Sequence, residues 1–216
     1  MANVTQLKHL EHLEDEMLNY GVEGCIASVN FLKELRKMLG CDNSTGFMQT
    51  KWDGAPSVVC GTDPNSGMFF VGTKSVFAKN SKACYDDVDV DLYYEGDLAE
   101  KLKYSLKYFS TLGIQGIVQG DLLFTTDVKR ETVNGEKLYT FTPNTITYGI
   151  PVDHPIGVAT GKAKIGVVFH THYRGDNFQT MQAVAGAKVK GSIEVLSVNN
   201  DTPMDRVGLN HSEEML

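Results

Sequence analysis

The sequence predicts an α+β fold in which a helical hairpin precedes a mainly antiparallel sheet. Up to residue 40 the apolar residues recur with helical spacing, whereas after Gly46 they form short strand-like runs separated by turns. The 216 residues are 42% hydrophobic and 22% charged, which is ordinary for a globular protein with one core and a small appendage. We therefore expect a helical hairpin over residues 1–45 and a sheet domain over residues 46–216.

The first forty residues predict two amphipathic helices. Thr5 can cap the first helix and Gly21 can end it, and Gly40 ends the second. Each helix carries an apolar stripe that should face inward. These stripes are Leu7, Leu10, Leu13, Met17 and Leu18 in the first helix, and Ile26, Val29, Leu32, Leu35 and Leu39 in the second.

Residues 46 to 91 predict a β-meander followed by an acidic loop. The runs GFMQTK, APSVVCGT and MFFVGTKSVFA predict strands, and DPNSG at 63–67 predicts a turn because its proline, asparagine and glycine accept the required backbone angles. We interpret DDVDVD at 86–91 as a solvated loop and not a metal site, because it lacks the glycine and terminal glutamate of a calcium loop.

A third helix is predicted over residues 96–113, with Asp97 as its N-cap and Glu100 as the capping-box partner. Its inward stripe is Leu98, Leu102, Leu106 and Phe109. Strand patterns then return in IQGIVQGDLLFT, KLYTFTPNTITYGI, AKIGVVFHTHY and GSIEVLSVN. The Asn-Gly pair in VNGEK predicts a hairpin turn.

Charge and cysteine usage exclude some classes of protein. A formal net charge of −7 argues against a protein that coats nucleic acid by neutralising phosphates, although a local basic site stays compatible with it. The four cysteines include no C-x-x-C pair and follow no secretory segment, which indicates a reducing cytoplasm. No apolar segment approaches the roughly 20 residues of a membrane helix, so we expect no spanning segment.

Lys51, in FMQTKWDGAPSVV, stands at a sharp Asp-Gly break between two strand-like runs. Most Lys-x-Asp-Gly sequences are ordinary turns, so the rest of the chain has to indicate a function. An amine that attacks a phosphate must be neutral and held in line with the leaving group, which a constrained turn favours. Asp53 and Gly54 supply such a turn, and the glycine leaves room for a nucleotide.

Two later positions complete a recognisable order. Lys74 follows a predicted hairpin in VGTKSVF, and Asp121 is an acid after glycine in the apolar strand GIVQGDLLFT. This order resembles the covalent nucleotidyltransferase superfamily, which includes ATP-dependent DNA and RNA ligases and mRNA capping enzymes. The resemblance covers roughly residues 46–173 and is nearest to RNA ligases and ligase-like proteins of phages.

The resemblance implies a fold, a reaction and a setting. The fold would be an antiparallel-sheet, ATP-grasp-like ligase core. The reaction would be the ATP-dependent joining of RNA or DNA ends, as in nucleic-acid repair, through a lysyl-AMP intermediate whose AMP passes to a 5′-phosphate. Magnesium would neutralise the phosphates. The setting would be the cytoplasm of a bacterium or of a phage-infected host, and both ATP and GTP fit the pattern.

The resemblance also implies residue roles. Lys51 would carry the adenylate, Lys74 would hold a phosphate or the ribose edge, and Asp121 would accept from the ribose hydroxyls or from a magnesium-bound water. An aromatic residue would stack on the adenine, and we prefer Phe169 to Phe141 for this place.

The sequence departs from the superfamily pattern in three ways. Lys74 stands where arginine is usual and cannot offer a bidentate fork, and Asp121 is one methylene shorter than the usual glutamate. Lys188 and Lys190 have the K-x-K form of the last motif, but no Glu-Gly motif precedes them after the aromatic strand. We expect that the missing motifs lie beyond Leu216 in a longer protein; the alternative is a reduced, inactive relative that binds a nucleotide or a partner.

Two other features allow two interpretations. His170 and His172 alternate along a predicted strand and would face one side, as zinc ligands do, but no third ligand is suggested nearby. We therefore interpret them as structural or surface histidines. Trp52 either stacks on a base or packs beside the hairpin.

Overall fold

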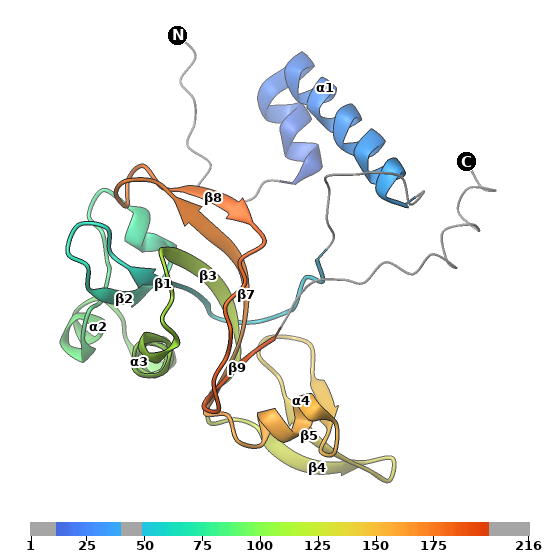
Figure 1. Cartoon of the computed structure of the whole chain (residues 1–216), viewed down its shortest axis with the longest axis vertical. Coiled ribbons are helices and arrows are strands. Elements are labelled where there is room, and N and C mark those ends of the chain that lie inside the picture. Colours follow the sequence, from blue (N-terminus) through green and yellow to red (C-terminus); the bar gives the residue numbers. More distant parts are fainter. Residues whose placement is uncertain (1–11, 40–48, 199–216) are drawn as a thin grey trace. The chain divides into compact units, whose positions relative to one another are not determined.

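The computed structural model describes residues 12–39 and 49–198 (Figure 1). Its helix α1 (Leu13–Leu39) and its residues 51–198 belong to two different compact units. The second unit combines helices with largely antiparallel sheets. The predicted α+β class, with an N-terminal helix, is therefore confirmed.

Helix α1 is interrupted at Gly21, as predicted. The glycine has φ 56° and ψ −125°, a conformation that costs other residues steric strain. The two segments fold back on each other, because Ser28 Oγ donates to the carbonyl of Leu13 (3.3 Å). A Cβ on Gly24 would fall 1.8 Å from the carbonyl oxygen of Glu16. Small residues thus form the contact between the segments.

The predicted inward stripes of this hairpin are largely wrong where the structure describes their burial: Leu13 and Leu35 are partly buried, but the other described members are exposed. Leu18 is 82% exposed, and Ile26, Val29 and Leu32 are each about half exposed, at 51%, 49% and 52%. The physical reason is the close approach at Gly24 and Ser28, which leaves large side chains no room between the segments. Thr5, Leu7, Leu10, Gly40 and the first half of the GFMQTK run (residues 46–48) lie outside the described residues.

The larger unit is built on a sheet with strand order β2-β1-β3-β7-β8, and β9 also pairs with β7. The strands are β1 (Ser57–Thr62), β2 (Phe69–Gly72), β3 (Ile117–Phe124), β7 (Ile165–Arg174), β8 (Gln182–Ala185) and β9 (Val195–Ser197). The β7–β9 pair is parallel and the other pairs are antiparallel. β3 and β7 lie at the centre and are almost entirely buried.

A second sheet has the order β4-β5-β6, with β4 (Lys129–Val133), β5 (Glu136–Phe141) and β6 (Tyr148–Pro151), and α4 (Pro155–Thr160) follows it. Asn134 and Gly135 turn β4 into β5 with φ of 51° and 86°, which confirms the predicted hairpin. The single strand expected over KLYTFTPNTITYGI is instead two strands, β5 and β6, separated by residues 142–147.

The helices of this unit correct three predictions. The acidic run forms α2 (Asp87–Tyr93) and not a loop, because Asp86 caps Asp89 N and the carboxylates of the first turn favour a helix N-terminus. α3 (Gly96–Phe109) begins after Glu95, so Asp97 is not its N-cap and instead pairs with Lys101 (2.9 Å). The strand expected to pass through Lys74 ends at Gly72, and the 3₁₀ helix η1 (Lys74–Phe77) follows.

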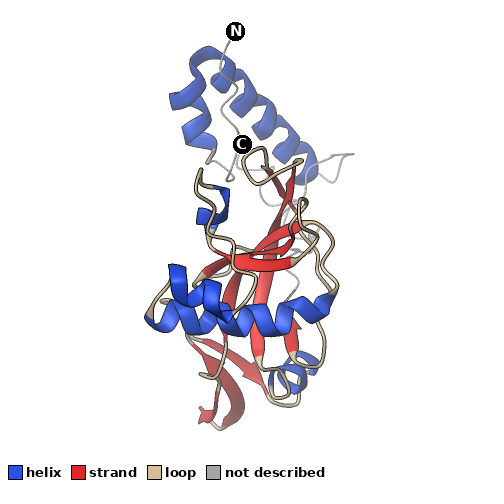
Figure 2. Cartoon of the chain, turned by 90° about the vertical axis from the view of Figure 1, so that its left-hand side faces the viewer, coloured by secondary structure: helices blue, strands red, loops and turns tan. Residues whose placement is uncertain are grey.

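Helix α3 lies across one face of the main sheet (Figure 2). Its Leu102 and Phe109 are buried against Val118, Leu122 and Phe169. The other face of the sheet carries a second apolar cluster that includes Phe70, Val76, Phe77, Tyr173 and Met181. A third cluster, formed by Leu123, Phe124, Phe141, Val168 and Leu196, joins the main sheet to the small one.

Gly61 in β1 offers a test of this packing. A Cβ there would lie 2.0 Å from the carbonyl oxygen of Gly116, and its φ is +146°. We expect Gly61→Ala to lower the free energy of unfolding by about 3 kcal/mol, since overpacking adds to backbone strain. Gly67→Ala is the matched control, because its φ is also positive (+71°) but no atom lies within 4 Å, so strain of about 1 kcal/mol remains. The free energy of unfolding is measured by urea denaturation. Equal losses in Gly61→Ala and Gly67→Ala would contradict the close packing described at Gly61.

Candidate functional site

The turn Lys51–Gly54 is held in place through Asp53. The carboxylate of Asp53 accepts four hydrogen bonds, from Asn144 Nδ2 (2.8 Å), Thr145 N (2.9 Å), Thr145 Oγ1 (2.7 Å) and Ile146 N (3.0 Å). Its backbone N–H donates to the hydroxyl of Tyr148 (2.8 Å). The hydrogen bond from the Thr145 hydroxyl, followed by the others, holds the pKa of Asp53 well below its ordinary range. Asp53 is therefore an anchor that shapes the turn.

Gly54 brings the turn against Asp121. A Cβ on Gly54 would lie 2.6 Å from the Cβ of Asp121, so only glycine fits without a shift. Ala55 N donates to the carbonyl of Leu122 (2.9 Å), and Ser57 is the register partner of Asp121. The structure thus places the lysine-bearing turn beside the acid. Lys51 itself is exposed and makes no hydrogen bond or ion pair with another described residue.

Trp52 packs beside the turn. Its ring centroid lies 5.0 Å from that of Tyr148, and its side chain joins the cluster between the two sheets. Its Nε1 is buried and has no hydrogen-bond partner among the residues that the structure describes. Of the two interpretations of Trp52, the structure agrees with packing.

His170 is the extra residue of a β-bulge in β7. Gln119 pairs with Thr171 and Gly120 pairs with Phe169, so His170 has no partner across the ladder. Its Nε2 lies 3.4 Å from Oδ2 of Asp121, and its Nδ1 lies 2.8 Å from the hydroxyl of Thr171. The contact of His170 with Asp121 was not predicted from the sequence. There, only the apolar residues that precede His170 in the strand mark its position.

The bulge separates His170 from His172. His172 pairs with Val118 beyond the bulge, and burial followed by the charge of Arg174 lowers its pKa. Because of the bulge, the regular alternation of side chains along a strand does not place the two histidine rings on one side. Within residues 12–39 and 49–198 no three His, Cys, Asp or Glu side chains come together as metal ligands would. Their interpretation as structural or surface histidines stays a prediction.

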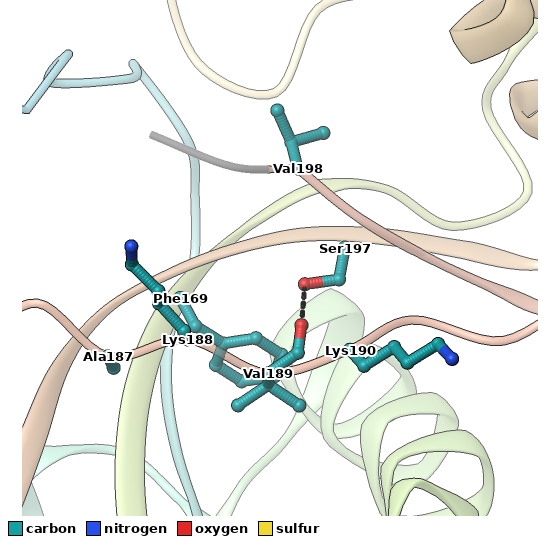
Figure 3. A pocket seen from close by; sticks show the side chains of 7 residues that line it. All are labelled: Phe169, Ala187, Lys188, Val189, Lys190, Ser197 and Val198. Carbon is teal, nitrogen blue, oxygen red and sulfur yellow. Dashed lines mark hydrogen bonds between the residues drawn. The ribbon is translucent and has the colours of Figure 1, made fainter. Parts of the chain in front are cut away.

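Phe169, Lys188 and Lys190 line one pocket of about 360 Å³ (Figure 3). Ala187, Val189, Ser197 and Val198 complete the lining, and Ser197 Oγ donates to the carbonyl of Val189 (2.6 Å). Phe169 is 2% exposed and its ring packs edge-on against Phe109 of α3, with centroids 5.5 Å apart. In Figure 3 the side chains of Lys188 and Lys190 point away from each other, so the two amines do not converge on one point.

The pocket and the turn use different faces of the main sheet. Phe169 belongs to the cluster under α3. Asp121 is two residues from Gln119 along β3 and shares its face, where Gln119 accepts a hydrogen bond from Tyr173. The predicted site residues therefore form two groups, one around Lys51 and Asp121 and one around Phe169.

Lys74 joins neither group, whereas Phe141 packs against Tyr148, whose hydroxyl binds the turn. Lys74 is exposed at the start of η1, where the Tyr94 hydroxyl binds Ser75 Oγ (2.8 Å) and the backbone N–H of Thr73 (3.3 Å). Phe141 is 2% exposed, with Phe124 and Tyr148 rings at 5.0 and 5.6 Å, so its ring faces are already covered. Phe169 is equally buried, so burial does not decide between the two phenylalanines.

The fold and site define an α+β protein with a lysine-bearing turn fixed against an acid of the central strand. The chain belongs to a family described as "Family of unknown function (DUF6267)", whose model matches residues 3–215. Comparison with curated proteins and with solved structures found no match. Among the helices that the structure describes, none is long and apolar enough to cross a lipid bilayer.

Asp53→Asn tests the anchor. An amide offers one acceptor oxygen in place of two, so we expect a lower unfolding temperature near pH 7. Because the pKa of Asp53 in the fold lies below its ordinary value of 3.8, the ionised carboxylate stabilises the fold above that pH, and the contribution is lost as the pH falls below it.

The difference between wild type and Asp53→Asn should therefore be constant from about pH 7 to about pH 5 and shrink toward about pH 3. Asp127→Asn is the control, since Asp127 accepts from Thr125 N (2.8 Å) in a local turn. A difference that does not change with pH would show that the Asp53 charge does not hold the turn.

Proposed function

We propose that this protein is an ATP-dependent nucleotidyltransferase of the polynucleotide ligase type. The contact of Gly54 with Asp121 carries the proposal, because it sets an exposed lysine on a constrained turn beside a carboxylate. Membership of the matched family neither supports nor opposes this, since the family has no described function.

In the proposed reaction, Nζ of Lys51 attacks the α-phosphorus of ATP. A P–N bond forms, the bond from the α-phosphorus to pyrophosphate breaks, and the amine proton passes to solvent. The AMP then moves to the 5′-phosphate of an RNA or DNA end, where a phosphoanhydride bond forms as the P–N bond breaks. A 3′-hydroxyl would complete the joining by attacking the activated 5′-phosphate, so that a phosphodiester bond forms as AMP leaves.

The residues around Lys51 would position its amine and help to neutralise the phosphates. Asp53 fixes the turn and so limits the directions that Lys51 can take. Asp121 is a partly exposed carboxylate, with 23% of its side chain accessible, and magnesium commonly binds proteins through one or two carboxylates and the substrate phosphates. Bound magnesium would offset the phosphate charge that develops during the attack.

The remaining predicted residues have weaker support. Lys188 and Lys190 bring two positive charges to the pocket beside Phe169, which favours a polyphosphate there although the amines diverge. Lys74 stays a prediction, because none of the contacts described for it joins it to the turn. Phe141 also stays a prediction: it packs on Tyr148 beside the turn, but neighbouring rings already cover it. The diverging amines favour the second candidate, a nucleotide- or partner-binding module without catalysis.

The test is formation of a covalent adduct. The protein is incubated with magnesium and α-labelled ATP, or separately GTP, and intact mass with peptide mapping locates any added nucleoside monophosphate. We expect an adduct on Lys51 that Lys51→Ala and Lys51→Arg both abolish, since arginine does not become a neutral nucleophile. Lys79→Ala, at another exposed lysine, is the control and should keep the adduct.

Two results would contradict the proposal. Nucleotide binding by calorimetry without an adduct would indicate the binding module. Absence of both binding and adduct would overturn the nucleotidyltransferase interpretation altogether. Where an adduct forms, transfer of its AMP to 5′-phosphorylated RNA or DNA oligonucleotides identifies the acceptor.

A further inference from the structure

We infer that His170 is a positioning residue that orients Asp121 for the reaction at Lys51. The inference rests on the proposed function. Three features of His170 support it: the contacts of its ring, the hydrogen bonds that its backbone carbonyl accepts, and its place as the extra residue of the β-bulge.

The ladder explains why the ring of His170 reaches Asp121. In regular pairing, β7 would place one residue opposite each residue of β3, but His170 is inserted between the partners of Gln119 and Gly120. A bulge changes the direction in which the extra side chain points, and bulges are frequent beside functional sites. Here the insertion brings the imidazole to the edge of Asp121, whose own register partner is Val168.

The contact itself suits orientation more than packing. Nε2 of His170 lies 3.4 Å from Oδ2 of Asp121, and the two side chains are 26% and 23% exposed. Thr171 Oγ1 at 2.8 Å from Nδ1 fixes the other side of the ring. One carboxylate oxygen is thereby restrained while the other stays available to a ligand. At 3.4 Å this polar contact is longer than a typical hydrogen bond, and such contacts in catalytic sites often tighten only when a ligand binds.

The backbone of His170 holds a second part of the candidate site. Its carbonyl oxygen accepts from Gly186 N (2.9 Å) and Ala187 N (3.3 Å). Gly186 has φ +92°, and the chain then continues into Lys188 and Lys190 of the pocket. The bulge residue thus contacts the acid of one group through its ring and the start of the lysine segment of the other through its carbonyl.

A matched set of variants separates orientation from general stability. His170→Ala removes the ring but keeps the carbonyl, and His170→Gln keeps an N–H donor near the place of Nε2. His172→Ala is the control on the same strand, since His172 pairs with Val118 and not with Asp121. Asp121→Asn and the double variant with His170→Ala complete a double-mutant cycle.

The measurements are the rate of adduct formation on Lys51 at saturating ATP and the affinity for ATP. We expect His170→Ala to lower the rate about 10-fold with a smaller change in affinity, the scale on which loss of an orienting partner acts. His170→Gln should recover most of that rate, and His172→Ala should leave it unchanged. The double variant should be about as slow as Asp121→Asn alone, because His170 acts through Asp121.

The outcomes distinguish this inference from the function on which it rests. An adduct in the wild type, with losses from His170→Ala and Asp121→Asn that multiply, would overturn the positioning role alone. The same holds if His170→Gln is as slow as His170→Ala, or if His172→Ala is equally slow. No adduct in the wild type would overturn the proposed function and the positioning role with it.

Discussion

The pairing of β3 with β7 is the constraint on which the rest of the structure depends. Both strands are covered on two sides, by α3 on one face and by the cluster around Phe70 and Tyr173 on the other. Burial on both faces sets the register, because a slip of one residue would exchange the two sets of side chains. The same pair carries Asp121, Phe169 and His170, so the positions of these three residues follow from this ladder.

The lysine-bearing turn is attached to that ladder by two different kinds of contact. Gly54 packs directly on Asp121, where the lack of a side chain permits the approach. Asp53 instead binds residues 144–146 of the loop between β5 and β6, so the small sheet supports the turn from the other side. The aspartate and glycine of the Lys-x-Asp-Gly motif thus have separate physical tasks, one electrostatic and one steric.

The candidate site was predictable from the sequence only where the signal was local. The Asp-Gly turn after Lys51 and the acid in an apolar strand are local patterns, and the structure brings them together. Phe169, Lys188 and Lys190 share a pocket, but their place on the α3 face could not be foreseen, because a bulge changes the alternation of β7 at His170. The hydrogen bonds from Asn144 and Thr145 to Asp53 could not be predicted from a sequence pattern, because more than ninety residues separate the partners.

By itself, the sequence determined the interruption at Gly21 and the hairpin at Asn134-Gly135, because these depend on backbone preferences. It also determined the α+β class and the apolar face of α3, because these depend on the spacing of apolar residues along one element. Tertiary structure decided that the acidic run becomes α2, that Asp53 is an anchor and that His170 reaches Asp121. These outcomes depend on hydrogen bonds and packing between segments distant in the chain, or on an irregularity in strand pairing, and neither is encoded in any single stretch of residues.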